Sequence, residues 1–428
     1  MSERRDRPDR PFRPDRPDWV DAVNRGEIWP MADVAAAPFT VDRIAGEAAS
    51  RLGIEPGEVT AGLGDAALEG LEVLLPALET EASLTVLGRW ITHRFIGRLV
   101  EQRLALDAYC ARDPGTLDDV IAAPWFVIGA PRTGTTILYG VLAQDPRHRV
   151  PEGWELLRPA PPPIPETRDR DVRIALADTE LRTPQVVMAG LTAIHEYSGR
   201  MPKECLSAMS LGFRSEEFVA RYHVPSYVTW LQRCDMRPAY EVHRRVLQVL
   251  QRRSPPRRWL LKSPVHLQSL DVLLSVYPDA RCSFTHRDPL AVLASVTSLL
   301  ATMRAVHRDH VDVPAIGRYH ADLYSRSLDR LVDACDTGLL DPARVTHTAF
   351  RDFVDGPMTV VESIYSQLGL DLPADTARVM AAYLADHPQG RHGAHEYSFD
   401  DLGLDAPSTR ARFGRYRARF GTDTGAVV

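Results

Sequence analysis

The sequence predicts an α/β fold in which a central parallel sheet is flanked by helices. Short runs rich in apolar and β-branched residues, as expected of strands buried on both faces of a sheet, occupy residues 125–129, 258–263, 281–287 and 343–348. Helical patterns separate these runs, and helices between successive strands are typical of parallel sheets with right-handed crossovers. Because ligands of such sheets bind at the carboxyl ends of the strands, we expect the functional residues there.

The rest of the chain is predicted to be helical or disordered. Residues 1–18 repeat Arg, Asp and Pro without an apolar set to bury, which predicts a disordered tail. Residues 19–428 predict one α/β domain. Within that domain, apolar residues at helical spacing predict a helical layer over 40–120. The stretch 147–255 is too long for a plain crossover, so it predicts a helical insertion, or lid, that covers the site.

Composition excludes several classes of function. The chain has 428 residues and a formal net charge of −6, which argues against a general nucleic-acid binder. Five scattered cysteines without a C-x-x-C pair argue against a disulfide scaffold or a zinc site and fit a reducing cytoplasm. No apolar run is long enough to span a membrane, and no His, Asp or Glu spacing predicts a metal site. Any anion site is therefore a local cluster of cations.

The segment 125–146 carries the most informative motif. An apolar run ends at Ile128, a loop with the sequence Gly-Ala-Pro-Arg-Thr-Gly-Thr-Thr follows over 129–136, and an amphipathic helix begins. This arrangement aims consecutive backbone N–H groups at an anion. The glycine spacing is that of a phosphate-binding loop, but two threonines replace the Lys-Ser or Lys-Thr pair of nucleotide triphosphatases. The loop cation is Arg132 instead, which shifts the prediction from ATP chemistry towards sulfuryl transfer.

A second group of polar residues follows the predicted strand 281–287. Arg287 lies at the tip of this strand, Asp288 and Pro289 are typical of a helix start, and Ser295 falls about two turns into that helix. An arginine and a hydroxyl so placed jointly bind one phosphate. We therefore expect the Arg287 guanidinium to lie close to the glycine loop, so that two cationic pockets bind opposite ends of one nucleotide.

These motifs resemble the sulfotransferases that use 3′-phosphoadenosine 5′-phosphosulfate (PAPS), and in particular a bacterial branch of that family. The resemblance covers roughly residues 45–420 and includes the segments 260–267 and 397–403. It implies the P-loop-containing sulfotransferase-like fold. It also implies that the 5′-phosphosulfate is bound by Arg132, Thr133, Gly134, Thr135 and Thr136, and that the 3′-phosphate is bound by Arg287, Ser295 and a C-terminal loop containing Arg391, His392 and Gly393.

The catalytic base does not follow from this resemblance. Cytosolic steroid and phenol sulfotransferases carry Lys-Thr-His on the second strand, but this chain has Lys262, Ser263 and Pro264 there. Other branches use a glutamate after the helix of the phosphosulfate loop. The candidates for the base are therefore, in order of preference, Glu155, Glu152 and His266. Lys262 and Arg132 are expected to stabilise the charge that builds up on the leaving group and the sulfonate.

The predicted activity is transfer of a sulfuryl group from PAPS, as co-substrate and without a metal, to a hydroxyl of a small molecule or glycolipid. In-line transfer depends mostly on positioning and charge stabilisation. Two alternatives remain open at this point: a Mg-ATP-dependent small-molecule kinase, which the missing loop lysine disfavours, and a non-catalytic nucleotide-binding relative that has lost its base. The acceptor and the oligomeric state do not follow from the sequence.

Overall fold

The computed structural model describes residues 16–29, 31–188, 191, 198–387 and 399–422. Its centre is a five-stranded sheet in which every paired strand is parallel, with the strand order β2-β3-β1-β4-β5. The strands are β1 (Trp125–Ile128), β2 (His148–Arg149), β3 (Arg258–Lys262), β4 (Arg281–His286) and β5 (Val345–Ala349). The predicted parallel α/β fold is confirmed, and four of the five strands fall on the predicted runs. The edge strand β2 was not predicted because two residues carry no periodic signal.

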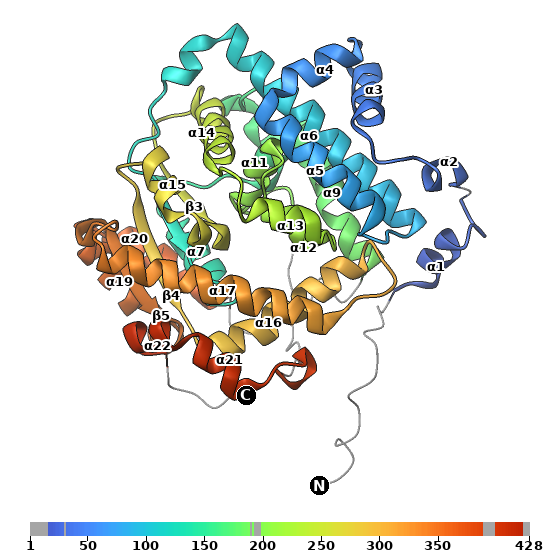
Figure 1. Cartoon of the computed structure of the whole chain (residues 1–428). Helices are drawn as coiled ribbons and strands as arrows, with labels where there is room; N and C mark the ends of the chain where they lie inside the picture. The colour runs from blue at the N-terminus through green and yellow to red at the C-terminus, as the bar shows by residue number, and fades with distance from the viewer. Residues whose placement is uncertain (1–15, 30, 189–190, 192–197, 388–398, 423–428) are drawn as a thin grey trace.

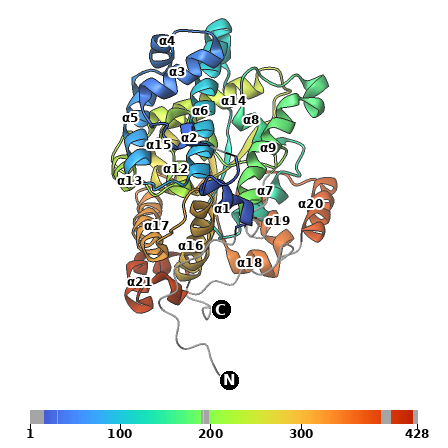
Figure 2. The same ribbon diagram turned by 90° about the vertical axis from the view of Figure 1, so that its right-hand side faces the viewer.

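The N-terminal helices form a layer on one side of the molecule, opposite the C-terminal helices (Figures 1 and 2). They are α1 (Asp18–Asn24), α2 (Ala32–Ala35), α3 (Val41–Leu52), α4 (Pro56–Leu63), α5 (Asp65–Thr80), α6 (Val86–Arg112) and η1 (Pro114–Asp118). Of the predicted tail, residues 1–15 lie outside the described residues. Arg16 is placed, and its Nε donates to the Ala305 carbonyl at 3.0 Å.

The stretch between β1 and β3 is mostly helical and also contributes the edge strand β2 to the sheet. Its helices are α7 (Thr135–Leu142), α8 (Gly153–Leu157), η2 (Pro165–Arg170), α9 (Val172–Val187), α11 (Leu206–Met209), η3 (Ser210–Gly212), α12 (Glu216–Arg221), α13 (Pro225–Leu231) and α14 (Arg237–Gln251). The remaining helices are η4 (Pro264–Gln268), α15 (Leu270–Val276), α16 (Pro289–Ala305), α17 (Val313–Asp336), η5 (Pro342–Arg344), α18 (Phe350–Asp355), α19 (Pro357–Gln367), α20 (Ala374–Asp386), η6 (Phe399–Leu402), α21 (Ala406–Arg412) and α22 (Gly414–Phe420).

Two apolar clusters cover the two faces of the sheet. Because successive strand residues point to opposite faces, Trp125 and Val127 pack with α7, α19 and α20, whereas Phe126 and Ile128 join the larger cluster with α14–α17 and the N-terminal layer. All four β1 residues are fully buried. The sheet therefore holds the carboxyl end of β1, where the glycine loop begins, on a rigid support.

The start of α6 contacts the segment that follows α16. The Thr85 N–H donates to the His307 carbonyl at 2.9 Å, and a Cβ added at Gly88 would lie 2.1 Å from that carbonyl oxygen. Gly46, in α3, has no atom within 4 Å of an added Cβ. Packing therefore requires a glycine at position 88 but not at position 46.

Gly88→Ala is therefore expected to destabilise the protein by about 1–3 kcal/mol, the usual cost of overpacking. The matched substitution Gly46→Ala is expected to stabilise it by about 0.5–1 kcal/mol, because alanine is the better helix former. Urea unfolding followed by circular dichroism measures both. Equal effects of the two substitutions would contradict this account of the interface.

Candidate active site

The glycine loop leaves β1 at Gly129 and ends at Gly134, which precedes α7. Gly134 has φ +89°, a left-handed conformation that favours glycine. A Cβ at Gly129 would lie 2.2 Å from the Thr285 Oγ1 atom and 2.7 Å from the Thr133 Oγ1 atom, so the loop backbone packs directly against β4. The first N–H groups of α7 have no acceptor within the helix. The loop is thus shaped to present backbone N–H groups to an anion.

Arg287 and Ser295 reach the loop residue Arg132 from a distant part of the chain. The Arg132 Nε donates to the Ser295 Oγ atom at 3.0 Å, and the Arg287 Nη1 donates to the Arg132 carbonyl at 2.7 Å. Arg287 also stacks over the Phe350 ring at 4.3 Å from the ring centroid. The predicted meeting of the glycine loop with Arg287 and Ser295 is confirmed.

The sequence also predicted how α16 begins. The Asp288 side chain accepts a hydrogen bond from the Leu290 N–H, and Pro289 is the first helical residue. This start places Ser295 two turns into α16, where its side chain is buried beside Arg132. Arg132 and Thr136 are exposed and accessible to a ligand. Arg391, His392 and Gly393 lie outside the described residues.

Lys262 lies next to the glycine loop and pairs with a residue that sequence reasoning missed. In the sheet Lys262 is opposite Val127, two residues before Gly129. Its Nζ forms an ion pair with Glu204, whose side chain is 26% exposed while that of Lys262 is only 5% exposed. The Cys205 N–H donates to the Lys262 carbonyl at 3.1 Å and fixes the segment that carries Glu204 against β3. Glu204 adjoins Lys203, one of the two lysines of the chain, but no motif marks it.

Glu155 and Glu152 form the N-terminal capping box of α8, in which each side chain accepts a hydrogen bond from the backbone N–H of the other residue. Glu155 is fully buried and pairs with Arg149 at 3.1 Å and Arg168 at 3.3 Å. Glu152 accepts from the Trp154 indole at 2.6 Å and pairs with Arg168 at 3.0 Å, and burial raises its pKa. The capping hydrogen bond and the two ion pairs of Glu155 hold α8 in place, which is a structural role.

His266 is also fully buried. Its Nδ1 lies 2.9 Å from the Tyr240 hydroxyl, and its ring packs edge-on against Phe126 at 5.0 Å between centroids. Burial holds the pKa of His266 well below its usual range. Because a base must reach the acceptor hydroxyl, the burial of Glu155 and His266 argues against the catalytic role predicted for them.

The chain matches known sulfotransferases over most of its length. A family model described as "Sulfotransferase family" covers residues 124–374. The crystal structure of sulfotransferase STF1 from Mycobacterium tuberculosis H37Rv is 31% identical, with a TM-score of 0.75, and the match covers 87% of this chain and 98% of that one. Sulfotransferase STF9 from Mycobacterium avium is 29% identical with a TM-score of 0.78, over 89% and 96% of the two chains.

The chain belongs to the sulfotransferase family. A further relative is the omega-hydroxy-beta-dihydromenaquinone-9 sulfotransferase Stf3 of Mycobacterium bovis, 29% identical over 288 residues, which are 62% of this chain and 67% of that protein. The P-loop-containing sulfotransferase-like fold expected from the sequence is confirmed. Within the described ranges, no helix is long and apolar enough to cross a bilayer, and no group of three His, Cys, Asp or Glu side chains is placed to hold a metal ion.

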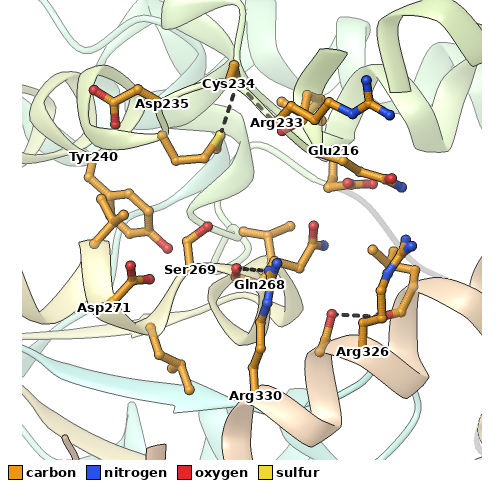
Figure 3. A pocket seen from close by; sticks show the side chains of 18 of the residues that line it. Glu216, Arg233, Cys234, Asp235, Tyr240, Gln268, Ser269, Asp271, Arg326 and Arg330 are labelled. Carbon is orange, nitrogen blue, oxygen red and sulfur yellow. Dashed lines mark hydrogen bonds between the residues drawn. The ribbon is translucent and has the colours of Figure 1, made fainter. Parts of the chain in front are cut away.

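Among the described residues, two of the cavities are large enough for a small molecule. The larger, of about 730 Å³, lies between α13, α15 and α17, and polar groups of mixed charge point into it, among them Glu216, Arg233, Asp271, Arg326 and Arg330 (Figure 3). None of the predicted site residues lines it. The smaller, of about 410 Å³, is lined by Leu156 and Leu157, directly after Glu155, and by Ser207, three residues after Glu204.

Because Glu155 balances the buried Arg149 charge, Glu155→Gln is expected to destabilise the fold by about 3 kcal/mol, as for other buried ion pairs that lose one partner. Calorimetry should show an apparent Tm lower by several degrees, while Glu72→Gln, at an exposed position of α5, leaves Tm unchanged. An unchanged Tm together with abolished turnover would instead restore Glu155 as a candidate base.

Proposed function

We propose that this sulfotransferase transfers the sulfuryl group of PAPS to a hydroxyl of a lipid-linked or small-molecule acceptor. The proposal rests on one observation: Ser295 and Arg287 both form hydrogen bonds with Arg132 of the glycine loop. Two cationic groups and a hydroxyl at this place fit a nucleotide with anionic groups at both ends. The loop lacks the lysine of ATP-using enzymes, which disfavours the kinase alternative.

The donor fits the residues that surround the loop. The N–H groups of Gly134, Thr135 and Thr136, with Arg132, would hold the 5′-phosphosulfate, and the close approach of the loop to Thr285 leaves no room for a side chain at Gly129. Arg287 and Ser295 would bind the 3′-phosphate. Arg391, His392 and Gly393 are proposed to complete this second pocket on the resemblance alone.

We infer that Glu204 is the base and that Lys262 acts on the leaving group. Glu204 is a partly exposed carboxylate that pairs with Lys262, the last residue of β3, which lies opposite Val127 in the sheet. In the transfer, the acceptor oxygen forms a bond to sulfur, and the bond between sulfur and the bridging oxygen breaks. The electron pair of that bond stays on the 5′-phosphate, where Lys262 stabilises it, and the acceptor proton passes to Glu204. Glu152, with its raised pKa, is the second candidate for the base.

The acceptor class is proposed from the relatives. Stf3 is named for an omega-hydroxy-dihydromenaquinone, a lipid that carries a hydroxyl. An acceptor with an apolar chain and a hydroxyl is the class that fits both this relative and the aromatic and aliphatic side chains in the lining of the smaller cavity.

Removal of the Arg287 guanidinium is expected to raise the Kd of adenosine 3′,5′-bisphosphate at least about tenfold, because a charge-assisted hydrogen bond contributes about 1.5–3 kcal/mol. Isothermal titration of Arg287→Ala measures this loss. The control is Arg378→Ala, an exposed arginine on α20 that pairs only with Asp375 among the described side chains. Wild-type affinity in Arg287→Ala, or no binding by the wild type, would refute the proposed donor site.

Glu204→Gln is expected to lower kcat by about 10²–10⁴, the usual contribution of a general base. The Kd of adenosine 3′,5′-bisphosphate should stay near the wild-type value, because no step of donor binding uses this carboxylate. The comparison variant, Glu152→Gln, should lose much less activity. A large loss in Glu152→Gln and none in Glu204→Gln would transfer the role of base to Glu152. Labelled donor and chromatographic product analysis provide the measurement.

A further inference from the structure

We propose that the groove between the N-terminal layer and α9 binds the apolar chain of the acceptor, with the reactive hydroxyl at its inner end. This inference rests on the proposed sulfuryl transfer. The groove, of about 410 Å³, has residues of α2, α3 and α6 on one side and of α8 and α9 on the other. These elements lie side by side on one face of the molecule (Figure 2). Its volume is within the range of small-molecule sites.

The segment 203–207 connects the groove to the Glu204–Lys262 pair, although neither member of the pair lines the groove, and the Ser207 N–H donates to the Glu204 carbonyl at 3.2 Å. Ser207, which lines the groove, follows Glu204 by three residues. The Lys203 ammonium, adjacent to Glu204, interacts electrostatically with the Glu217 carboxylate and the Arg98 guanidinium, and both of these side chains line the groove. A molecule in the groove therefore ends within a few residues of the proposed base.

The chemistry of the walls favours an apolar chain over a free anion. Most charged side chains of the lining are in ion pairs: Arg98 pairs with Glu180 at 2.9 Å, Arg221 with Glu217 at 2.7 Å, and Arg43 with Glu47 at 2.8 Å. Beside these pairs the lining includes apolar side chains of Val34, Trp90, Ile91, Phe95, Leu157, Leu181 and Pro184. An aliphatic or isoprenoid chain would bury these apolar side chains.

Three buried polar atoms of the lining residues have no hydrogen-bond partner among the described residues: the Ser207 Oγ, the Arg158 Nη1 and the His93 Nδ1. A buried polar group without a partner costs about 1–3 kcal/mol. An oxygen of the acceptor next to Ser207, three residues after Glu204, would supply one of these partners, which makes the predicted ligand an amphiphile.

The entrance is apolar as well. Trp29 and Ile28 are about half exposed, and Trp29 packs edge-on against Trp90 at 5.5 Å between ring centroids. Val186, at the end of α9 beside the groove residue Pro184, is 59% exposed. Exposed aromatic and aliphatic side chains at the mouth of a groove are typical of sites that take apolar ligands. Trp29 thus extends the apolar surface that Trp90 contributes to the groove.

Binding of 12-bromododecanol to the full chain tests the groove directly, because bromine quenches the fluorescence of Trp90 and Trp29. Ile91→Ser is expected to raise the Kd about tenfold, since one apolar side chain is lost from the wall. Val379→Ser, at an exposed position of α20 on the opposite face of the sheet, should leave the Kd unchanged. The inference would be overturned if the wild type, Ile91→Ser and Val379→Ser bound 12-bromododecanol with equal Kd values, or if no quenching occurred.

A kinetic arm separates this inference from the proposed function. With PAPS and linear alcohols, kcat/KM of the wild type should rise up to about fourfold per added CH₂ group, and Ile91→Ser should flatten this rise. The Kd of Ile91→Ser for adenosine 3′,5′-bisphosphate should equal that of the wild type. Transfer to short alcohols without dependence on chain length would refute the groove and keep the function. Quenching by the brominated alcohol without any transfer would refute the function and keep the groove.

Discussion

The hydrogen bonds of Arg132 are the contacts on which the candidate site depends. The side chain of this loop residue donates to Ser295 of α16, while its carbonyl accepts from Arg287 at the end of β4. One residue thus ties the glycine loop to the neighbouring strand and its helix. Arg132 has φ +70°, an uncommon conformation for a non-glycine residue. Such backbone strain is maintained where surrounding contacts determine the conformation, and here the two hydrogen bonds provide those contacts.

The proposed donor half of the site follows from local sequence, and this explains why the convergence of its residues was predictable. Each of its two patterns is contained in a stretch of about ten residues. One is the glycine loop, and the other runs from Arg287 through the start of α16 to Ser295. The parallel sheet then brings β1 and β4 together as neighbours, so that the two local patterns meet. For β1, burial of all four residues makes the apolar run a reliable sign of a central strand.

The proposed acceptor half, the Glu204–Lys262 pair, did not follow from the sequence. Glu204 reaches Lys262 across 58 residues, and the pairing depends on how the helical insertion returns to β3. Nothing local distinguishes Glu204 from a solvated glutamate. The reverse holds for Glu155 and His266, whose neighbouring motifs predicted a catalytic role although the fold buries both side chains fully. Sequence patterns specify which residues follow a strand but not whether a side chain faces solvent or a buried arginine.

The buried ion pairs around α8 explain why the insertion can serve as the wall of a site. Glu155 is surrounded by Arg149 of the edge strand β2 and Arg168 of η2, and Arg149 also stacks over Trp259 of β3 at 4.5 Å. Removing one partner from such a cluster is far more costly than replacing the whole cluster with apolar residues. The cluster therefore fixes one arrangement of α8 relative to the sheet. Because Leu156 and Leu157 follow Glu155 directly, the same cluster determines where the wall of the groove lies with respect to β3.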